Sequence, residues 1–101
     1  MSNQEPVFRT IVLSGPMTLY ESSDIRDQLR SALEEGQPLR LDLETTGPWD
    51  LSGLQLLASA VASGRKLDVL VRFDHVPRVC AEVAERAGLG AWLAERTESF
   101  L

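Results

Sequence analysis

The chain has 101 residues, which is enough for one domain with a single hydrophobic core. Its 44% apolar and 25% charged residues are an ordinary globular composition, and a net charge of −5 without any run of Lys or Arg argues against nucleic acid as a partner. The single cysteine, Cys80, excludes an internal disulfide and, with only one histidine, leaves no cluster for a zinc site.

The N-terminal residues 1–6 are polar and lack the basic start and apolar centre of a signal peptide. No apolar run approaches the roughly 18 residues that a membrane span needs. We therefore expect a cytoplasmic protein with no direct membrane insertion, no metal and no cofactor.

The N-terminal region predicts a β-hairpin. Residues 7–13 (VFRTIVL) are rich in β-branched and apolar side chains, as strands are, and residues 14–16 (SGP) have the chemistry of a turn. The short apolar run at residues 17–20 (MTLY) is expected to return as a second strand.

An amphipathic helix and a third strand follow. Four apolar residues recur at helical spacing on one face of this helix: Ile25, Leu29, Ala32 and Leu33. Gly36 ends the helix. Residues 39–43 (LRLDL) alternate apolar and polar side chains and predict a strand, and residues 45–48 (TTGP) predict a loop after it.

The second half of the chain continues the alternation of helix and strand. We expect a helix over residues 52–63 and a strand over residues 66–73. A third helix begins near Asp74 and Pro77, because proline is tolerated in a first helical turn, and Gly88 ends it. Five of its residues are expected to point inward: Val79, Cys80, Val83, Ala84 and Ala87.

A short last element at residues 91–95 places Trp92 and Leu93 where they cover one edge of the core. The order is then β β α β α β α with a final helical turn, and strands separated by helices imply right-handed parallel crossovers. The predicted fold class is α/β, one domain over residues 1–101, with a mixed β-sheet of four to five strands packed by three to four helices.

The segment 49–57 (WDLSGLQLL) joins a strand and loop to a helix through polar residues and one glycine. Asp50 is a good N-cap residue, which places Ser52 and Gly53 in the first turn. Unpaired backbone N–H groups and the helix dipole favour negative charge at that position. A phosphoryl group on Ser52 would be compatible with the fold, whereas an acidic or apolar partner surface docked there would be repelled.

The helical periodicity separates two faces of the helix over residues 52–63. Its inward face is expected to contain Leu54, Leu57, Ala58 and Val61. Its outward face is expected to contain Ser52, Gln55, Ser59 and Ser63, and Leu56 falls with this second group. An exposed leucine one turn from Ser52 predicts a small docking patch.

One sequence pattern in this chain resembles that of a known family. The pattern LDL, six residues, then D-x-S-G-L-x-x-L stands at residues 41–43 and 50–57, and it is similar to the STAS domain of bacterial anti-sigma factor antagonists. The layout of nearly the whole chain resembles that family, which implies a STAS-like fold.

The resemblance also implies a function. In regulatory members, the serine or threonine that corresponds to Ser52 is phosphorylated by a kinase that doubles as an anti-sigma factor. The unphosphorylated domain binds that kinase and frees a sigma factor, and a phosphatase resets the switch. The implied protein is a bacterial transcription regulator and phosphoprotein that acts in signal transduction as a monomer or weak dimer.

Two departures from the family pattern support an alternative. Leu51 stands where many relatives carry a second hydroxyl residue, and Trp49 stands where an aliphatic residue is usual. A related branch serves as the STAS subunit of lipid-transport ABC systems or lies in chemotaxis operons, and there Ser52 would be docking surface without a phosphate. In a further alternative, Ser52 is only a residue that stabilises the helix start by hydrogen bonding.

An enzymatic role finds no support in the sequence. A hydrolase using Ser52 would lack a base, because the only histidine, His75, is interpreted as a solvent-exposed loop residue. Cys80 is interpreted as a packing residue. We therefore predict a non-enzymatic interaction domain whose contact site comprises Trp49, Asp50, Ser52, Gly53, Gln55, Leu56 and Ser59.

Overall fold

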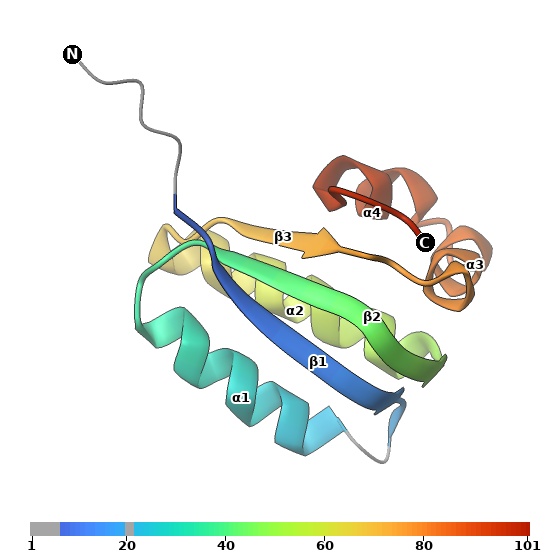
Figure 1. Ribbon diagram of the computed structural model, residues 1–101, viewed down its shortest axis with the longest axis horizontal. Coiled ribbons are helices and arrows are strands. Elements are labelled where there is room, and N and C mark those ends of the chain that lie inside the picture. Colours follow the sequence, from blue (N-terminus) through green and yellow to red (C-terminus); the bar gives the residue numbers. More distant parts are fainter. Residues whose placement is uncertain (1–6, 20–21) are drawn as a thin grey trace.

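Strands and helices alternate along most of the chain, as Figure 1 shows. The computed structural model describes residues 7–19 and 22–101. In this part of the chain the elements are, in order, β1 (Arg9–Met17), α1 (Ser22–Glu34), β2 (Leu39–Trp49), α2 (Leu51–Leu67), β3 (Val71–Asp74), α3 (Arg78–Arg86) and α4 (Gly90–Arg96). The α/β class is confirmed.

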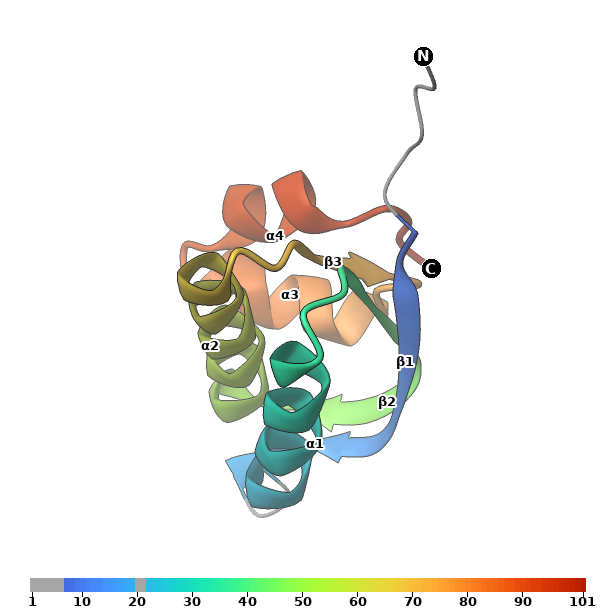
Figure 2. The same ribbon diagram turned by 90° about the vertical axis from the view of Figure 1, so that its left-hand side faces the viewer.

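Within the described residues, three parallel strands form one sheet in the order β1-β2-β3. Leu41 in the central strand pairs with Ile11 on β1 and with Phe73 on β3, and all three side chains are buried. Figure 2 shows α1 and α2 on the same side of this sheet. The core therefore lies between the sheet and these helices.

The predicted patterns of α1 and of the first half of β2 are confirmed. All four residues of the apolar stripe on α1 are buried. In β2, Leu39, Leu41 and Leu43 are completely buried, whereas Arg40 and Asp42 between them are partly exposed on the other face. Alternation along the strand therefore directs the leucines toward the helices.

The predicted hairpin is wrong. Met17 is the last residue of β1, residues 18–19 belong to no strand, and residue 20 lies outside the described part of the chain. β1 continues through the expected turn because it keeps pairing with β2, with two register shifts between Val12 and Met17 and a positive φ of 82° at Gly15. The described sheet thus has three strands instead of four to five, and it is parallel instead of mixed.

Two other boundaries differ from the prediction. Residues 45–48, expected as a loop, belong to β2, which runs on to Trp49. Helix α2 extends to Leu67 and ends at Asp68, whose left-handed backbone (φ 62°) lets its N–H reach carbonyls of the last turn. β3 consequently begins later than predicted, at Val71.

Helix α3 packs on the core through a narrow strip. Cys80 and Ala84 are buried and Val83 is partly buried, as predicted. Val79 and Ala87 are exposed, so their predicted inward orientation is wrong: Ala87 lies just beyond the helix end, and Val79 points away from the strip. Burial raises the pKa of the Cys80 thiol to about 12, as expected for a packing residue.

The C-terminal segment covers β3 as the sequence predicts. On α4, Leu93 is buried, and the ring of Trp92 packs at a tilt against Phe73 with centroids 5.9 Å apart. Beyond α4, Thr97 bridges to Phe73. Among residues 7–19 and 22–101, none of the helices has the length and hydrophobicity that crossing a lipid bilayer requires.

Candidate functional site

The first turn of α2 is held by Asp50. Its Oδ1 atom accepts hydrogen bonds from the backbone N–H groups of Ser52 (2.8 Å) and Gly53 (3.3 Å). Its Oδ2 atom accepts from the N–H of Leu19 at 3.4 Å. The predicted N-cap is confirmed, and the same carboxylate also ties the segment after β1 to the start of α2.

Gly53 is required by close packing. A Cβ atom built on Gly53 would collide with the carbonyl oxygen of Met17 and lie only 2.9 Å from Met17 Cβ and from Cε3 of Trp49. Trp49 is buried, and its indole Nε1–H donates to Thr46 Oγ1 at 3.0 Å. Trp49 therefore anchors the helix start from within the core, which makes it an indirect contributor to any contact site.

The polar residues of the predicted contact site reach the surface. Gln55 and Ser59 are exposed, and Asp50 and Ser52 are partly exposed. Ser52 thus lies at the helix start with its side chain partly accessible, next to the capping carboxylate. The four residues share the N-terminal half of α2 and the residue that caps it.

The predicted exposure of Leu56 is wrong. Leu56 is only 5% exposed, and Ala60, one turn further along, is equally buried. Both lie where α1 packs alongside α2, and this contact buries a second side of α2 in addition to the side that faces the sheet. Helical periodicity identifies one buried stripe, and the second arises because a neighbouring helix covers it.

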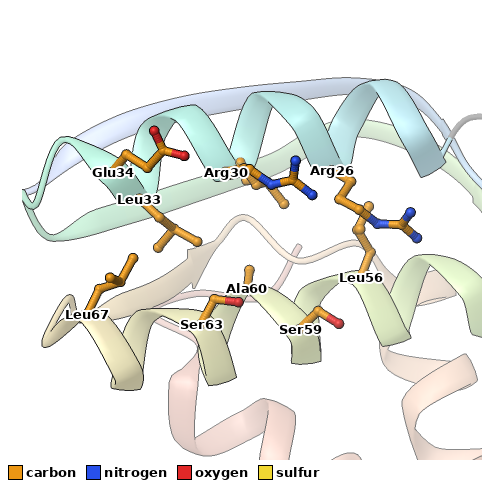
Figure 3. A pocket seen from close by; sticks show the side chains of 10 residues that line it. Arg26, Arg30, Leu33, Glu34, Leu56, Ser59, Ala60, Ser63 and Leu67 are labelled. Atoms are coloured by element: carbon orange, nitrogen blue, oxygen red, sulfur yellow. The ribbon is translucent and has the colours of Figure 1, made fainter.

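Two adjoining depressions lie along α2, and the smaller one borders Ser52. The smaller, which we call the Ser52 pocket, has a volume of about 180 Å³. It is lined by Leu19, Arg26, Ser52, Gln55, Leu56 and Ser59. The larger, the α1–α2 groove, has about 470 Å³ and shares Arg26, Leu56 and Ser59 with the pocket. Figure 3 shows Arg26 and Arg30 on α1, across this groove from Ser59 and Ser63 on α2.

Sequence reasoning missed Arg26. It occupies the polar side of α1 and belongs to no motif, so nothing in its surroundings along the chain relates it to Ser52. Only the packing of α1 against α2 brings the two residues to one pocket.

A second polar cluster surrounds His75, after the end of β3. The ring Nδ1 lies 3.2 Å from Asp42 Oδ1, and 3.8 Å from both Glu44 Oε1 and Asp74 Oδ2. The Asp42 carboxylate contributes most to raising the pKa of His75, and Asp74 and Glu44 add to it. A hydrogen bond from the Ser99 hydroxyl lowers the pKa of Asp74. His75 is therefore part of an ion cluster and only partly exposed, in contrast to the predicted exposed loop residue.

The cluster also has the spacing of a cation site. Single ligand atoms of Asp42, Glu44 and His75 all lie within 4.8 Å of one another. A protonated imidazole among carboxylates accounts for the same geometry, because it supplies the positive charge that the carboxylates need.

The His75 cluster predicts a pH-dependent stability. Because the folded state raises the pKa of His75 above 6.5, its stabilising contribution is present below that value and is lost as the pH rises through the folded pKa. We expect thermal melting between about pH 6 and 9 to show this loss in the wild type and not in His75→Asn. Asparagine tolerates the positive φ of 51° at this position, so the variant removes the titration without backbone strain. Parallel melting curves of the two proteins across this range would contradict the assignment.

Known proteins resemble this chain both in sequence pattern and in fold. The sequence matches the family model described as Mlab, STAS domain over residues 2–95. The chain belongs to the STAS family. STAS domains are regulatory and interaction domains, and the residues that carried the resemblance, at 41–43 and 50–57, lie within the matched range.

Two solved structures share the STAS fold with this chain. A sulfate transporter family protein from Wolinella succinogenes is 20% identical with a TM-score of 0.70, covering 92% of this chain and 75% of that one. The anti-sigma factor antagonist SpoIIAA in its unphosphorylated form is 18% identical with a TM-score of 0.68, covering 91% and 77%. A search of curated protein sequences finds no match. At these identities the likeness establishes the fold.

Proposed function

We propose that this STAS domain is a regulatory protein-interaction module that docks its partner over the start of α2 and is switched by phosphorylation of Ser52. The observation that carries the proposal is the position of Ser52, partly accessible in the first turn of α2 and flanked by Asp50 and exposed Gln55 and Ser59. By similarity to anti-sigma factor antagonists such as SpoIIAA, the partner is a serine kinase that acts as an anti-sigma factor in the cytoplasm. A phosphatase would reset the switch.

The surroundings of Ser52 suit a kinase substrate. In the proposed reaction, Ser52 Oγ forms a bond to the γ-phosphorus of ATP, the bond from that phosphorus to the leaving ADP oxygen breaks, and the hydroxyl proton passes to a base. Among the described residues that line the Ser52 pocket, the polar side chains besides Ser52 are Arg26, Gln55 and Ser59, none of which is a carboxylate or an imidazole, and the nearby Asp50 carboxylate already accepts three N–H groups. The kinase therefore supplies the base, and this domain contributes the acceptor hydroxyl.

Phosphorylation changes the charge of the docking surface. A phosphoryl group adds about −1.5 to −2 charges at neutral pH. The helix start tolerates that charge, because backbone N–H groups and the dipole favour anions there. A partner surface that fits the neutral hydroxyl beside the Asp50 carboxylate would instead be repelled. Binding is therefore lost while the fold persists.

A second candidate function rests on the family match itself. The matching family model is named for Mlab, and Leu51 replaces the second hydroxyl residue that many anti-sigma factor antagonists carry. In this candidate the domain is the STAS subunit of a lipid-transport ABC system, or a chemotaxis-associated STAS protein, and docks through the same surface without phosphorylation.

Intact-mass and peptide mass spectrometry of the protein from its native cell tests the switch. We expect a fraction of the chains to carry one phosphoryl group, located on Ser52, and a Ser52→Ala variant to lose it. Native co-purification identifies the class of protein that binds the domain. The first function predicts a soluble kinase, and the second predicts an ATPase with membrane subunits. Unmodified Ser52 under every growth condition, together with recovery of the ATPase, would overturn the first function in favour of the second.

A further inference from the structure

Arg26 and Arg30 are two cations of α1 that line the α1–α2 groove. Neither forms an ion pair with any residue that the structure describes, although the chain carries 15 acidic and 10 basic residues. They lie one turn apart on α1, and in Figure 3 Arg26 reaches toward α2 whereas Arg30 lies against α1. Only Arg26 also lines the Ser52 pocket.

The Ser52 pocket matches a phosphoryl group in size and in chemistry. Its volume of about 180 Å³ has room for several water molecules of roughly 30 Å³ each, and so for a group attached to Ser52 Oγ. Among the described residues, its polar lining besides Ser52 consists of the Arg26 guanidinium, the Gln55 amide and the Ser59 hydroxyl, all of which can donate hydrogen bonds. A guanidinium binds phosphate oxygens with two parallel, charge-assisted hydrogen bonds.

A cation near Ser52 would offset the negative charges of the Asp50 carboxylate and of a phosphoryl group on Ser52. The Asp50 carboxylate is held at the helix start by three N–H donors, so its negative charge stays beside Ser52. A phosphoryl group there meets a fixed like charge, and Arg26 is the cation in the pocket that can offset both.

We infer that Arg26 is the phosphate-binding residue of the switch: when Ser52 is phosphorylated, the Arg26 guanidinium binds the phosphoryl oxygens in the Ser52 pocket. This inference deepens the proposed function, because it assumes that Ser52 carries the phosphoryl group. It also adds a link between modification and docking. Arg26 lines the α1–α2 groove as well, so its recruitment by the phosphoryl group removes a positive charge from the groove.

The experiment uses the full chain with phosphoserine incorporated at position 52 by an expanded genetic code, so no kinase is needed. The second pKa of phosphoserine, about 6 in isolation, is followed by ³¹P NMR titration. We expect Arg26→Gln to raise this pKa by roughly half a unit or more relative to the unsubstituted phosphoprotein. Arg30→Gln is the matched control and should raise it by clearly less, because Arg30 lines the groove and not the pocket.

A second readout follows the guanidinium directly. The Nε–H resonance of Arg26 should shift when position 52 changes from serine to phosphoserine, and that of Arg30 should stay. Equal pKa changes in the two variants, or an Arg26 resonance that does not move, would overturn the inference. Because the phosphoserine is supplied synthetically, these outcomes are independent of whether native cells phosphorylate Ser52, which the mass spectrometry decides.

Discussion

We expect Ser52→Asp to weaken partner binding by about 2 to 5 kcal/mol, if the helix start becomes fully buried in the complex. The substitution places a permanent carboxylate beside that of Asp50, and a partner that fits the neutral hydroxyl must then bury a second negative charge. Isothermal titration with the partner that co-purifies with the wild-type domain measures the loss. Ser63→Asp is the matched control, because Ser63 is an exposed serine on the same helix that lines the groove and not the Ser52 pocket.

The same substitution should leave the stability of the free domain nearly unchanged. An acidic residue in the first turn of a helix gains roughly 0.3 to 1 kcal/mol from the dipole and backbone N–H groups, which offsets repulsion from Asp50. Urea denaturation of Ser52→Asp should therefore overlay that of the wild type. An unfolded variant would show that Ser52 is a structural residue, and normal affinity would remove the switch from the proposed function.

Gly53→Ala has the largest expected effect on folding, a loss of about 2 to 3 kcal/mol. The added methyl group would collide with the Met17 carbonyl oxygen and with the Trp49 ring, and neither can yield easily because one is backbone and the other is buried. The start of α2 must move away from the end of β1. Partner binding should weaken in parallel, since Ser52 moves with this turn.

Gly90→Ala controls for the intrinsic effect of the glycine-to-alanine change. A Cβ atom at Gly90, the first residue of α4, would meet only the Glu85 carboxylate and backbone at a looser distance, and the carboxylate end of a glutamate side chain can swing away. Its denaturation midpoint should lie close to that of the wild type. If Gly53→Ala proved equally stable, the close contact between the helix start and β1 would not constrain the glycine.

Local signals in the sequence were sufficient for several features. The helical spacing of apolar residues in α1, the alternation in β2 and the capping role of Asp50 each depend on residues a few positions apart, whose geometry the backbone sets by itself. For the same reason, the partly accessible position of Ser52 in the first turn could be predicted without coordinates. These short-range features also carried the resemblance to the STAS family.

Contacts between distant segments decided the rest. Leu56 is buried because α1 covers it, β1 runs through its expected turn because β2 offers continued pairing, and His75 is drawn into a cluster by carboxylates on β2. Arg26 reaches the Ser52 pocket only because α1 packs beside α2. The sequence by itself determined the approximate helix starts and made Ser52 the candidate for phosphorylation. Which charges and surfaces surround that residue depended on tertiary packing, because neighbours in space are not neighbours along the chain.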